Sequence, residues 1–366
     1  MIYLDNSATT FPKPKEIIDA MTEFATNYVS PNRNSHTLGL NSSRKLYETR
    51  KIVGDFFGTN PLSVAFTSNA TESLNLVIHS LFDENDHVII SPYEHNSVVR
   101  PLENIPYSVM TLKNLEIDYN FDDLIQENTK AIICTHSSNI TGTILNLKKL
   151  STLAKKHNLI LILDVAQSGG LVPINMKKDN IDILCFTGHK YLYGISGVGG
   201  ICVNGNFPFK AVKRGGSGSD SLLSHPTNMP DVFEAGTHNF VSIFTLGVAI
   251  KIISEETNIL ERENKIIEYI YDELKSVNNF IFYGNIQEDR TPLLSFNFSN
   301  KLPQDVGQML NDENIAIRSG YICAPLIHKY LGSEKTGVCR ISPSMFTTND
   351  EVEHLVHRLK SRCTST

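Results

Sequence analysis

The chain carries short apolar runs that alternate with amphipathic stretches through its first two thirds. Five runs predict strands: Leu62–Thr67, His87–Ser91, Ala131–His136, Leu159–Val165 and Ile181–Phe186. The run Leu159–Val165 is apolar throughout, which is typical of a strand buried on both faces. The stretches Thr71–Leu81 and Leu147–His157 predict helices between the strands. This alternation indicates an α/β fold with a mostly parallel sheet and helices on both of its faces.

The pattern changes after about residue 240. Two long helices are predicted at Val241–Glu255 and Leu260–Ser276, followed by short strands at Phe280–Tyr283 and Leu293–Phe298. A helix is expected after Pro303, and Asn349–Lys360 predicts the last one. A chain of 366 residues suggests about two domains. We therefore predict a large domain over 15–252 and a smaller α+β domain over 253–366, which residues 1–14 join.

Composition narrows the possible partners. The net charge of -6 argues against a nucleic-acid binder, which would carry a basic excess. No apolar run approaches the ~18 residues of a membrane span, and the N-terminus lacks the pattern of a signal peptide. None of the six cysteines forms a C-x-x-C pair, so neither a metal site nor a disulfide framework is expected. We expect a cytoplasmic protein that binds neither membrane nor nucleic acid.

Polar side chains follow each predicted strand at the point where the strand ends. The clusters are Ser68–Glu72, Glu94–Asn96, His136–Asn139, Asp164–Gln167 and Thr187–Lys190. In an open parallel sheet, ligands bind beyond the carboxyl ends of the strands. We therefore expect these five clusters to meet at one edge of the sheet.

The residue types in these clusters suit pyridoxal 5'-phosphate (PLP). That cofactor needs a lysine for a Schiff base, an acid beside its pyridine nitrogen and donors for its phosphate. Lys190 is the candidate for the Schiff base, and Asp164 is the candidate for the acid. Thr71 begins a predicted helix, whose free N–H groups favour a phosphate.

Three further residues complete the prediction. Thr187 and His189 offer donors beside the lysine, and His95 could stack on the ring. Taken singly, each of these residues has an ordinary explanation, such as a cap, a turn or a solvated side chain. Their recurrence at one topological position is what favours a cofactor site.

Longer segments of the chain resemble a known family. They include YLDNSATT at Tyr3–Thr10, FTSNATESLN at Phe66–Asn75, DVAQ at Asp164–Gln167, TGHK at Thr187–Lys190, RSGYICA at Arg318–Ala324 and CRIS at Cys339–Ser342. These segments resemble the cysteine desulfurases of the class V aminotransferase group, which are fold type I PLP enzymes. The resemblance covers nearly the whole chain and is nearest to the second subgroup, which has a compact cysteine loop. The resemblance implies a mostly parallel, seven-stranded sheet that is flanked by helices.

The resemblance also implies roles for particular residues around the cofactor. Ala70 and Thr71 fall in the phosphate-binding turn, and His95 is expected to stack on PLP. Gln167 is expected at the phenolic oxygen, and Asn139 near that oxygen and the substrate carboxylate. Thr237 matches a threonine that reaches the phosphate of the partner subunit, which implies a homodimer.

The implied reaction converts L-cysteine to L-alanine. Cys323 matches the catalytic cysteine and would receive the sulfur as a persulfide, for later transfer to an acceptor protein. Arg340 would clamp the substrate carboxylate, and Lys190 would act as general acid and base. His36 is one candidate for the group that takes the proton of Cys323.

Other functions stay open at this point. A selenocysteine lyase, or another class V enzyme that does not need Cys323, would share the cofactor. The loop Tyr191–Gly197 is slightly longer than is usual in the second subgroup, so a desulfurase-like sister branch also fits. A protein that binds PLP for sulfur trafficking without catalysis is a third alternative. A nucleotide-binding oxidoreductase would have to use Gly194–Gly200, which lacks a complete G-x-G-x-x-G before a helix.

Overall fold

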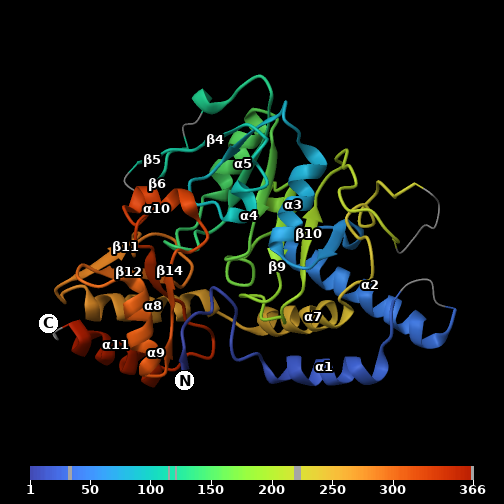
Figure 1. Ribbon diagram of the computed structural model, residues 1–366. Coiled ribbons are helices and arrows are strands. Elements are labelled where there is room, and N and C mark those ends of the chain that lie inside the picture. The colour runs from blue at the N-terminus through green and yellow to red at the C-terminus, as the bar shows by residue number, and fades with distance from the viewer. Residues whose placement is uncertain (32–34, 114–115, 120–121, 218–223, 364–366) are drawn as a thin grey trace.

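A seven-stranded sheet forms the centre of the computed structural model, which describes residues 1–31, 35–113, 116–119, 122–217 and 224–363 (Figure 1). The strand order is β2-β10-β9-β8-β7-β3-β4. The bounds are Val64–Thr67 for β2, His87–Ile90 for β3, Tyr107–Val109 for β4, Thr129–Thr135 for β7, Ile160–Asp164 for β8, Ile183–Thr187 for β9 and Gly199–Val203 for β10. Every strand runs in the same direction except β10, which is antiparallel to both neighbours. The prediction of a mostly parallel sheet is therefore confirmed.

Both faces of the central sheet are buried. Successive side chains of each strand point to opposite sides, so each strand contributes to two apolar cores. On β2, Val64 and Phe66 belong to one apolar core and Ala65 to the other. The first core lies under helices α2 (Thr37–Phe57), α5 (Leu147–Lys156) and α7 (Phe240–Glu255), and α1 (Lys15–Asn27) packs on α7. The second core lies under α3 (Ala70–Leu81). These strands are apolar along their length because both faces of the sheet pack against helices.

The strand β10 explains the glycines that offered the only candidate nucleotide loop. Gly199 and Gly200 lie in the sheet between β2 and β9. A Cβ atom on Gly199 would come within 2.6 Å of the carbonyl oxygen of Phe186, and one on Gly200 within 2.6 Å of the Phe186 ring. These glycines serve close packing inside the sheet, so the nucleotide-loop reading of Gly194–Gly200 is wrong.

A second, antiparallel sheet has the order β11-β12-β15-β14. Its strands are Phe280–Tyr283, Leu294–Phe298, Val338–Ile341 and Arg318–Gly320 in that order. Its core includes Phe296 and side chains of α8 (Ile259–Leu274), α9 (Pro303–Asp312) and α11 (Asn349–Cys363). Strand β1 (Ile2–Tyr3) pairs with β13 (Ile315–Ala316), so the N-terminus lies beside these elements (Figure 1). The two sheets fall on either side of the predicted domain boundary, and the boundary itself stays a prediction.

The remaining short elements connect these layers. They are β5 (Leu112–Lys113), β6 (Glu116–Ile117), α4 (Asn96–Val99), α6 (Met176–Asp179), α10 (Pro325–Leu331) and the 3-10 turns η1 (Pro61–Ser63) and η2 (Asp122–Leu124). Because η1 precedes β2, the predicted strand Leu62–Thr67 begins two residues later than expected. Among the helices in the described residues, none combines the length and apolar character that crossing a membrane requires.

Candidate active site

The polar clusters that follow the central strands surround one cavity. Nine residues predicted for the cofactor line it: Ala70, Thr71, His95, Asn139, Asp164, Gln167, Thr187, His189 and Lys190. Strands β3, β7, β8 and β9 run in parallel, so their carboxyl ends bring these segments to one edge. The convergence expected from the sequence is therefore present in the structure.

Lys190 and Asp164 are the charged pair of this cavity. Burial lowers the pKa of Lys190 to about 8, although the nearby charge of Asp164 acts in the opposite direction. Burial raises the pKa of Asp164, whose Oδ1 accepts a hydrogen bond of 2.9 Å from the Ala166 N–H. A lysine with a lowered pKa can supply a free amine near neutral pH, and a bound cation would stabilise the ionised form of Asp164.

The peptide that carries Lys190 is held by the N-terminal segment. The carbonyl oxygen of His189 accepts hydrogen bonds from the Thr10 N–H at 3.1 Å and from Lys13 Nζ at 2.9 Å. On the other side of Lys190, the hydroxyl of Tyr191 lies 2.8 Å from Ser7 Oγ. Lys190 therefore projects from a backbone that is fixed on both sides.

The N-terminus of α3 forms a second wall of the cavity. Asn69 caps this helix, with its Oδ1 accepting a hydrogen bond of 2.9 Å from the Glu72 N–H. Ala70 and Thr71 begin the helix and line the cavity. Free N–H groups at a helix N-terminus favour an anion such as phosphate.

Two imidazoles beside the cavity are neutral at pH 7. Burial lowers the pKa of His95 to about 4, with Lys190 and Arg100 adding to the effect. Burial likewise lowers the pKa of His189 to about 4. His95 Nδ1 accepts a hydrogen bond of 3.0 Å from the Ser97 N–H, and Ser97 Oγ lies 2.7 Å from Thr71 Oγ1. Ser97 thus links the predicted stacking residue to the predicted phosphate site.

Several buried polar atoms of the cavity have no partner within the described protein. They are Asn139 Oδ1, Gln167 Oε1, Thr187 Oγ1 and His189 Nδ1. Buried polar groups in native proteins are normally satisfied, so this group indicates a polar ligand. An amine, a buried carboxyl group, a helix N-terminus and a free hydroxyl are the groups that PLP requires. The residues of the cavity therefore fit PLP.

Arg340 reaches the site from β15 in the second sheet. Its Nη1 donates to the carbonyl oxygen of Asn139 at 2.9 Å, and its Nη2 donates to Asp5 Oδ1 at 3.1 Å. Its Nε is buried without a partner among the described residues. Asp5 Oδ2 also lies 3.1 Å from Arg318 Nη2. Arg340 is thus oriented by two fixed contacts and keeps a donor free for a carboxylate.

Cys323 lies at the mouth of the cavity. Its side chain is exposed, and it lines a groove together with Thr71, His95 and Ser97, which also line the cavity. The Asn96 N–H donates to the carbonyl oxygen of Cys323 at 2.8 Å. The candidate nucleophile therefore lies in a groove that adjoins the cavity of Lys190, and Arg340 bonds to Asn139, which lines that cavity.

Two further predicted residues line neither this cavity nor the groove of Cys323. His36 caps the N-terminus of α2, where its Nδ1 accepts a hydrogen bond of 3.1 Å from the Gly39 N–H. Thr237 lines a separate hollow together with Glu234 and Lys213. Their predicted roles in catalysis and in the partner's phosphate site stay predictions.

The sequence reasoning missed the roles of Asp5 and Ser97. Asp5 falls inside the YLDNSATT segment, but nothing in the sequence indicates that its carboxylate would bridge two arginines. Ser97 lies two residues after His95, and that spacing after a strand is a local signal for a side chain that bonds the histidine.

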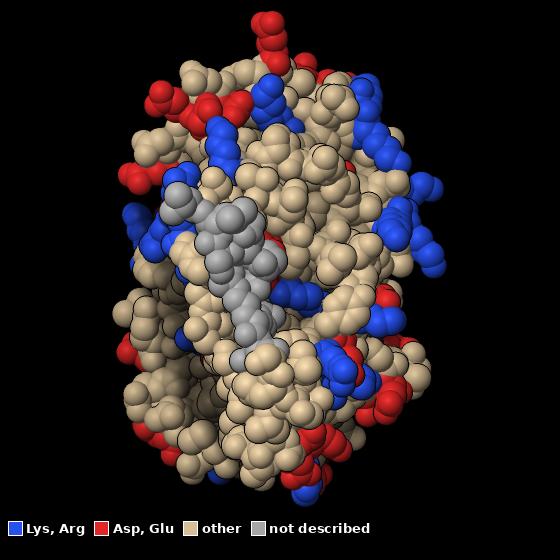
Figure 2. Space-filling model, turned by 90° about the vertical axis from the view of Figure 1, so that its right-hand side faces the viewer, with Lys and Arg blue, Asp and Glu red and all other residues tan. Residues whose placement is uncertain are grey.

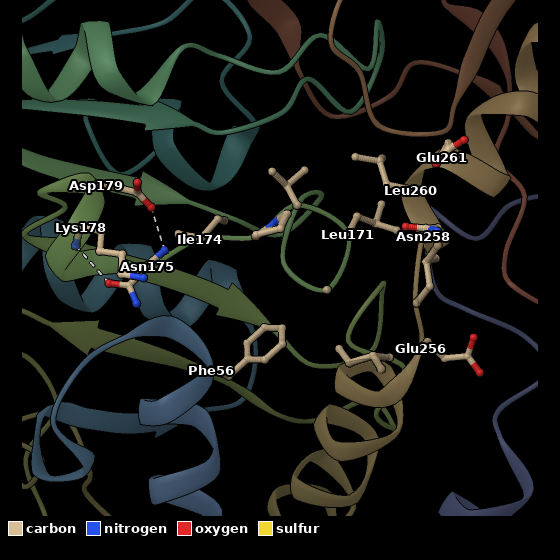
Figure 3. A pocket seen from close by; sticks show the side chains of 15 residues that line it. Phe56, Leu171, Ile174, Asn175, Lys178, Asp179, Glu256, Asn258, Leu260 and Glu261 are labelled. Carbon is tan, nitrogen blue, oxygen red and sulfur yellow. Dashed lines mark hydrogen bonds between the residues drawn. The ribbon is translucent and has the colours of Figure 1, made fainter.

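A wider hollow lies away from the cavity (Figure 3). Asn175 and Asp179 lie on one side of it, and Leu260 and Glu261 lie on the other. No residue predicted for catalysis or cofactor binding lines it. Its size therefore does not make it the candidate active site.

Comparisons with known proteins agree on one family. The family model for "Aminotransferase class-V" matches residues 2–355. A probable cysteine desulfurase of Borreliella burgdorferi is 30% identical, over 98% of this chain and 91% of its own length. A cysteine desulfurase of Escherichia coli O157:H7 is 32% identical, over 98% and 93%. The apo structure of a cysteine desulfurase from Thermococcus onnurineus NA1 superposes with a TM-score of 0.93 at 30% identity, over 100% of this chain and 95% of the other.

Proposed function

Because the chain belongs to the class V aminotransferase family, as one of its cysteine desulfurases, we propose that it uses PLP on Lys190 and Cys323 to remove sulfur from L-cysteine. The observation that carries this proposal is the arrangement of four groups: Lys190 and Asp164 line one cavity, Cys323 lines the groove beside it, and Arg340 bonds to Asn139 of the same cavity. The first two fit the cofactor. The last two suit an amino acid that has a carboxylate and a sulfur.

Bound PLP would supply an electron sink that makes the bonds at the substrate's α and β carbons easier to break. Asp164 would hold the ring nitrogen, and the N-terminus of α3 would hold the phosphate. Lys190, once released by the substrate amine, would move the proton at the α carbon. Its pKa of about 8 suits a group that both accepts and gives protons near neutral pH.

Arg340 and Cys323 would act on the other two ends of the substrate. Arg340 would bind the carboxylate through its free Nε–H, while Asp5 and the Asn139 carbonyl hold its plane. The Cys323 thiolate would attack the sulfur of the substrate, so that an S–S bond forms as the Cβ–S bond breaks. The electron pair left on Cβ takes up a proton. The products are L-alanine and a persulfide on Cys323, and the balance needs no outside oxidant or reductant.

We also propose that the protein acts as a homodimer. Figure 2 views the side of the molecule on which α2 and the chain after β10 lie, and its central area carries few charged side chains. On α2, Leu38, Leu40 and Tyr47 are each about half exposed. Exposed apolar side chains on a surface with few charges are typical of a protein–protein interface. A partner subunit on this side would give Thr237 the role that the resemblance implies.

The persulfide must be unloaded by a further partner, because a second turnover needs the free thiol. We propose a sulfur-acceptor protein that reaches Cys323 from solvent, since the side chain is exposed. The five cysteines whose side chains the structure describes are free thiols, which supports a cytoplasmic, reducing location.

The test combines an absorption spectrum with product assays. The purified protein is expected to show the visible band of bound PLP and to release alanine and sulfide from L-cysteine with a thiol reductant. Cys323→Ala should keep the band and lose sulfide release, whereas Lys190→Ala should lose the band. Full desulfurase activity in Cys323→Ala would favour a selenocysteine-lyase-type or other class V reaction. A normal band without turnover of any amino acid would favour a trafficking protein.

A further inference from the structure

Cys323 is presented by a short turn between β14 and α10. Its side chain is exposed, whereas its neighbours Ile322 and Ala324 are buried at 7% and 0% exposure. The turn therefore packs on both sides of the cysteine and holds a single side chain outward. The position of the sulfur then depends on what fixes the backbone of this turn.

His328 fixes the backbone directly before Cys323. Its side chain is buried, and its Nε2 lies 3.2 Å from the carbonyl oxygen of Ile322. Its Nδ1 lies 2.8 Å from Ser333 Oγ. A carbonyl oxygen only accepts, so Nε2 carries the hydrogen and Nδ1 accepts from the Ser333 hydroxyl. Burial lowers the pKa of His328, which keeps this neutral tautomer at pH 7.

Further contacts join the same two segments. The Ser333 N–H donates to the carbonyl oxygen of His328 at 3.0 Å, which fixes the residue that orients the imidazole. The Tyr321 ring meets the imidazole edge to face, with 5.8 Å between centroids. The Tyr321 hydroxyl donates to the carbonyl oxygen of Glu334 at 2.5 Å. The residues before Cys323 are thus held to segment 328–334 at several points, and His328 contacts Ile322, Tyr321 and Ser333.

We propose that His328 is a positioning residue for Cys323, holding the turn so that the sulfur stands at the mouth of the cavity. His328 acts through the Ile322 carbonyl and is not itself a catalytic residue. The inference rests on the proposed function, because it assigns His328 to the step in which the persulfide forms. Steps that use only Lys190 do not depend on it.

Because persulfide formation and the steps of Lys190 should respond differently, comparing the two tests the proposal. In PLP-loaded enzyme, His328→Phe keeps the size of the side chain but removes the imidazole donor of the Ile322 carbonyl, which keeps only the Ala324 N–H at 2.5 Å. Persulfide loading of Cys323 in a single turnover should slow about three- to tenfold, the effect of one lost neutral hydrogen bond. Exchange of the α-hydrogen of L-alanine with D₂O, which needs Lys190 but not Cys323, should stay within about twofold of wild type. His328→Gln, which can still donate, should recover part of the loading rate.

A second measurement uses the PLP-free protein. Amide hydrogen exchange in peptides that cover 318–326 should become faster in His328→Phe, while peptides from α11 should not change. His357→Phe, an exposed histidine of α11, is the control and should leave both regions unchanged.

The outcomes separate the two proposals. Wild-type loading in His328→Phe overturns the positioning role. An equal loss of loading and of α-hydrogen exchange also overturns it, because His328 would then support the fold as a whole. If wild-type enzyme forms no persulfide on Cys323, the proposed function fails. The exchange of residues 318–326 in PLP-free protein then still decides whether His328 holds the turn, and an unchanged rate there contradicts it.

Discussion

The backbone N–H of Asn96 donates a hydrogen bond of 2.8 Å to the carbonyl oxygen of Cys323. Asn96 is the first residue of α4 and directly follows His95, the residue expected to stack on PLP. The bond therefore fixes the turn of the candidate nucleophile to the wall of the cofactor cavity. It is also a contact between the two predicted domains.

Removing this donor should slow persulfide formation. Asn96→Pro lacks the N–H, and proline is well tolerated at the first position of a helix. The preceding His95 already has an extended backbone with φ -70 and ψ 156, which suits a residue before proline. We expect loading of Cys323 to fall about three- to tenfold, corresponding to about 0.5–1.5 kcal/mol for one neutral hydrogen bond.

The matched control is Asn96→Ala, which removes the side chain but keeps the N–H. It should load Cys323 at close to the wild-type rate in the same single-turnover assay. Equal rates for the proline and alanine variants would show that the backbone bond does not matter.

Asp5 should affect substrate affinity more than turnover. It bridges Arg340 and Arg318, so Asp5→Ala leaves the buried Arg340 without one of its two orienting contacts. We expect the KM for L-cysteine to rise about tenfold, equivalent to about 1.5 kcal/mol for a charge-assisted hydrogen bond, with kcat changing much less. Steady-state alanine production measures both constants. Asp19→Ala, which breaks an exposed ion pair on α1, should change neither.

The capture of PLP should report the pKa of Lys190. Only the uncharged amine can react with the aldehyde of PLP, and burial lowers the pKa of Lys190 to about 8. The rate of PLP capture by PLP-free protein should therefore rise with pH and level off above about pH 8. Growth of the visible band after stopped-flow mixing at a series of pH values measures it. A midpoint near pH 10 would mean that Lys190 behaves as an ordinary lysine.

Asp164→Asn should shift that midpoint. The charge of Asp164 stabilises the Lys190 ammonium and so raises its pKa. Removing this charge should move the midpoint to lower pH and also weaken the retention of PLP. A midpoint that moved upward would contradict the assigned interaction.

A buried ion pair should dominate the acid sensitivity of the large sheet. Arg50 Nη1 donates to Glu234 Oε1 at 2.6 Å, and Glu234 Oε1 also accepts from the Phe66 N–H at 2.7 Å. Burial acts to raise the pKa of Glu234, but Arg50 and His238 outweigh it and lower the pKa to about 2. A depressed pKa stabilises the fold above the unfolded value near 4.5, and this contribution is lost as pH falls toward 2.

Arg50→Met should lower the free energy of unfolding by about 3 kcal/mol at pH 7, because the buried carboxylate loses its arginine and keeps only His238 and the Phe66 N–H as partners. The deficit should shrink at pH 3–4, where Glu234 of the variant is protonated. Urea unfolding at the two pH values measures this. The double variant Arg50→Met with Glu234→Gln should be more stable at pH 7 than Arg50→Met alone, and a less stable double variant would contradict the explanation.

The spacing of apolar residues was sufficient to predict the helices and strands that are buried along one face or along both faces. Phe280–Tyr283 has the predicted bounds, and the predicted helix Thr71–Leu81 begins only one residue earlier, at Ala70. The strand β10 was not predicted because its two glycines resemble a loop. Residues on neighbouring segments, Phe186, Asn69 and Ala65, leave no room for a Cβ atom there. Local pattern does not reveal what lies across a sheet.

Prediction of the candidate site from the sequence is limited in the same way, because local pattern does not show contacts between distant segments. Lys190, Asp164 and Thr71 could be assigned because each follows a strand, and topology alone brings strand ends together. Asp5, Asn96 and His328 act through contacts with residues more than 200 positions away or through backbone groups that have no sequence signature. His36 was proposed from its residue type, and the structure places it at a helix cap.

The pairing of residues 2–6 with residues far along the chain has a consequence for biosynthesis. The ribosome makes residues 2–6 long before residues 314–316 and Ser342, to which they bond. The segment must remain without these partners until residue 342 has been made. Through Asp5 and Thr10, residues 3–10 then contact Arg340 and the peptide that carries Lys190. The proposed active site therefore cannot be completed before residue 342 has been made, so a product interrupted earlier should be unable to produce reactive sulfur.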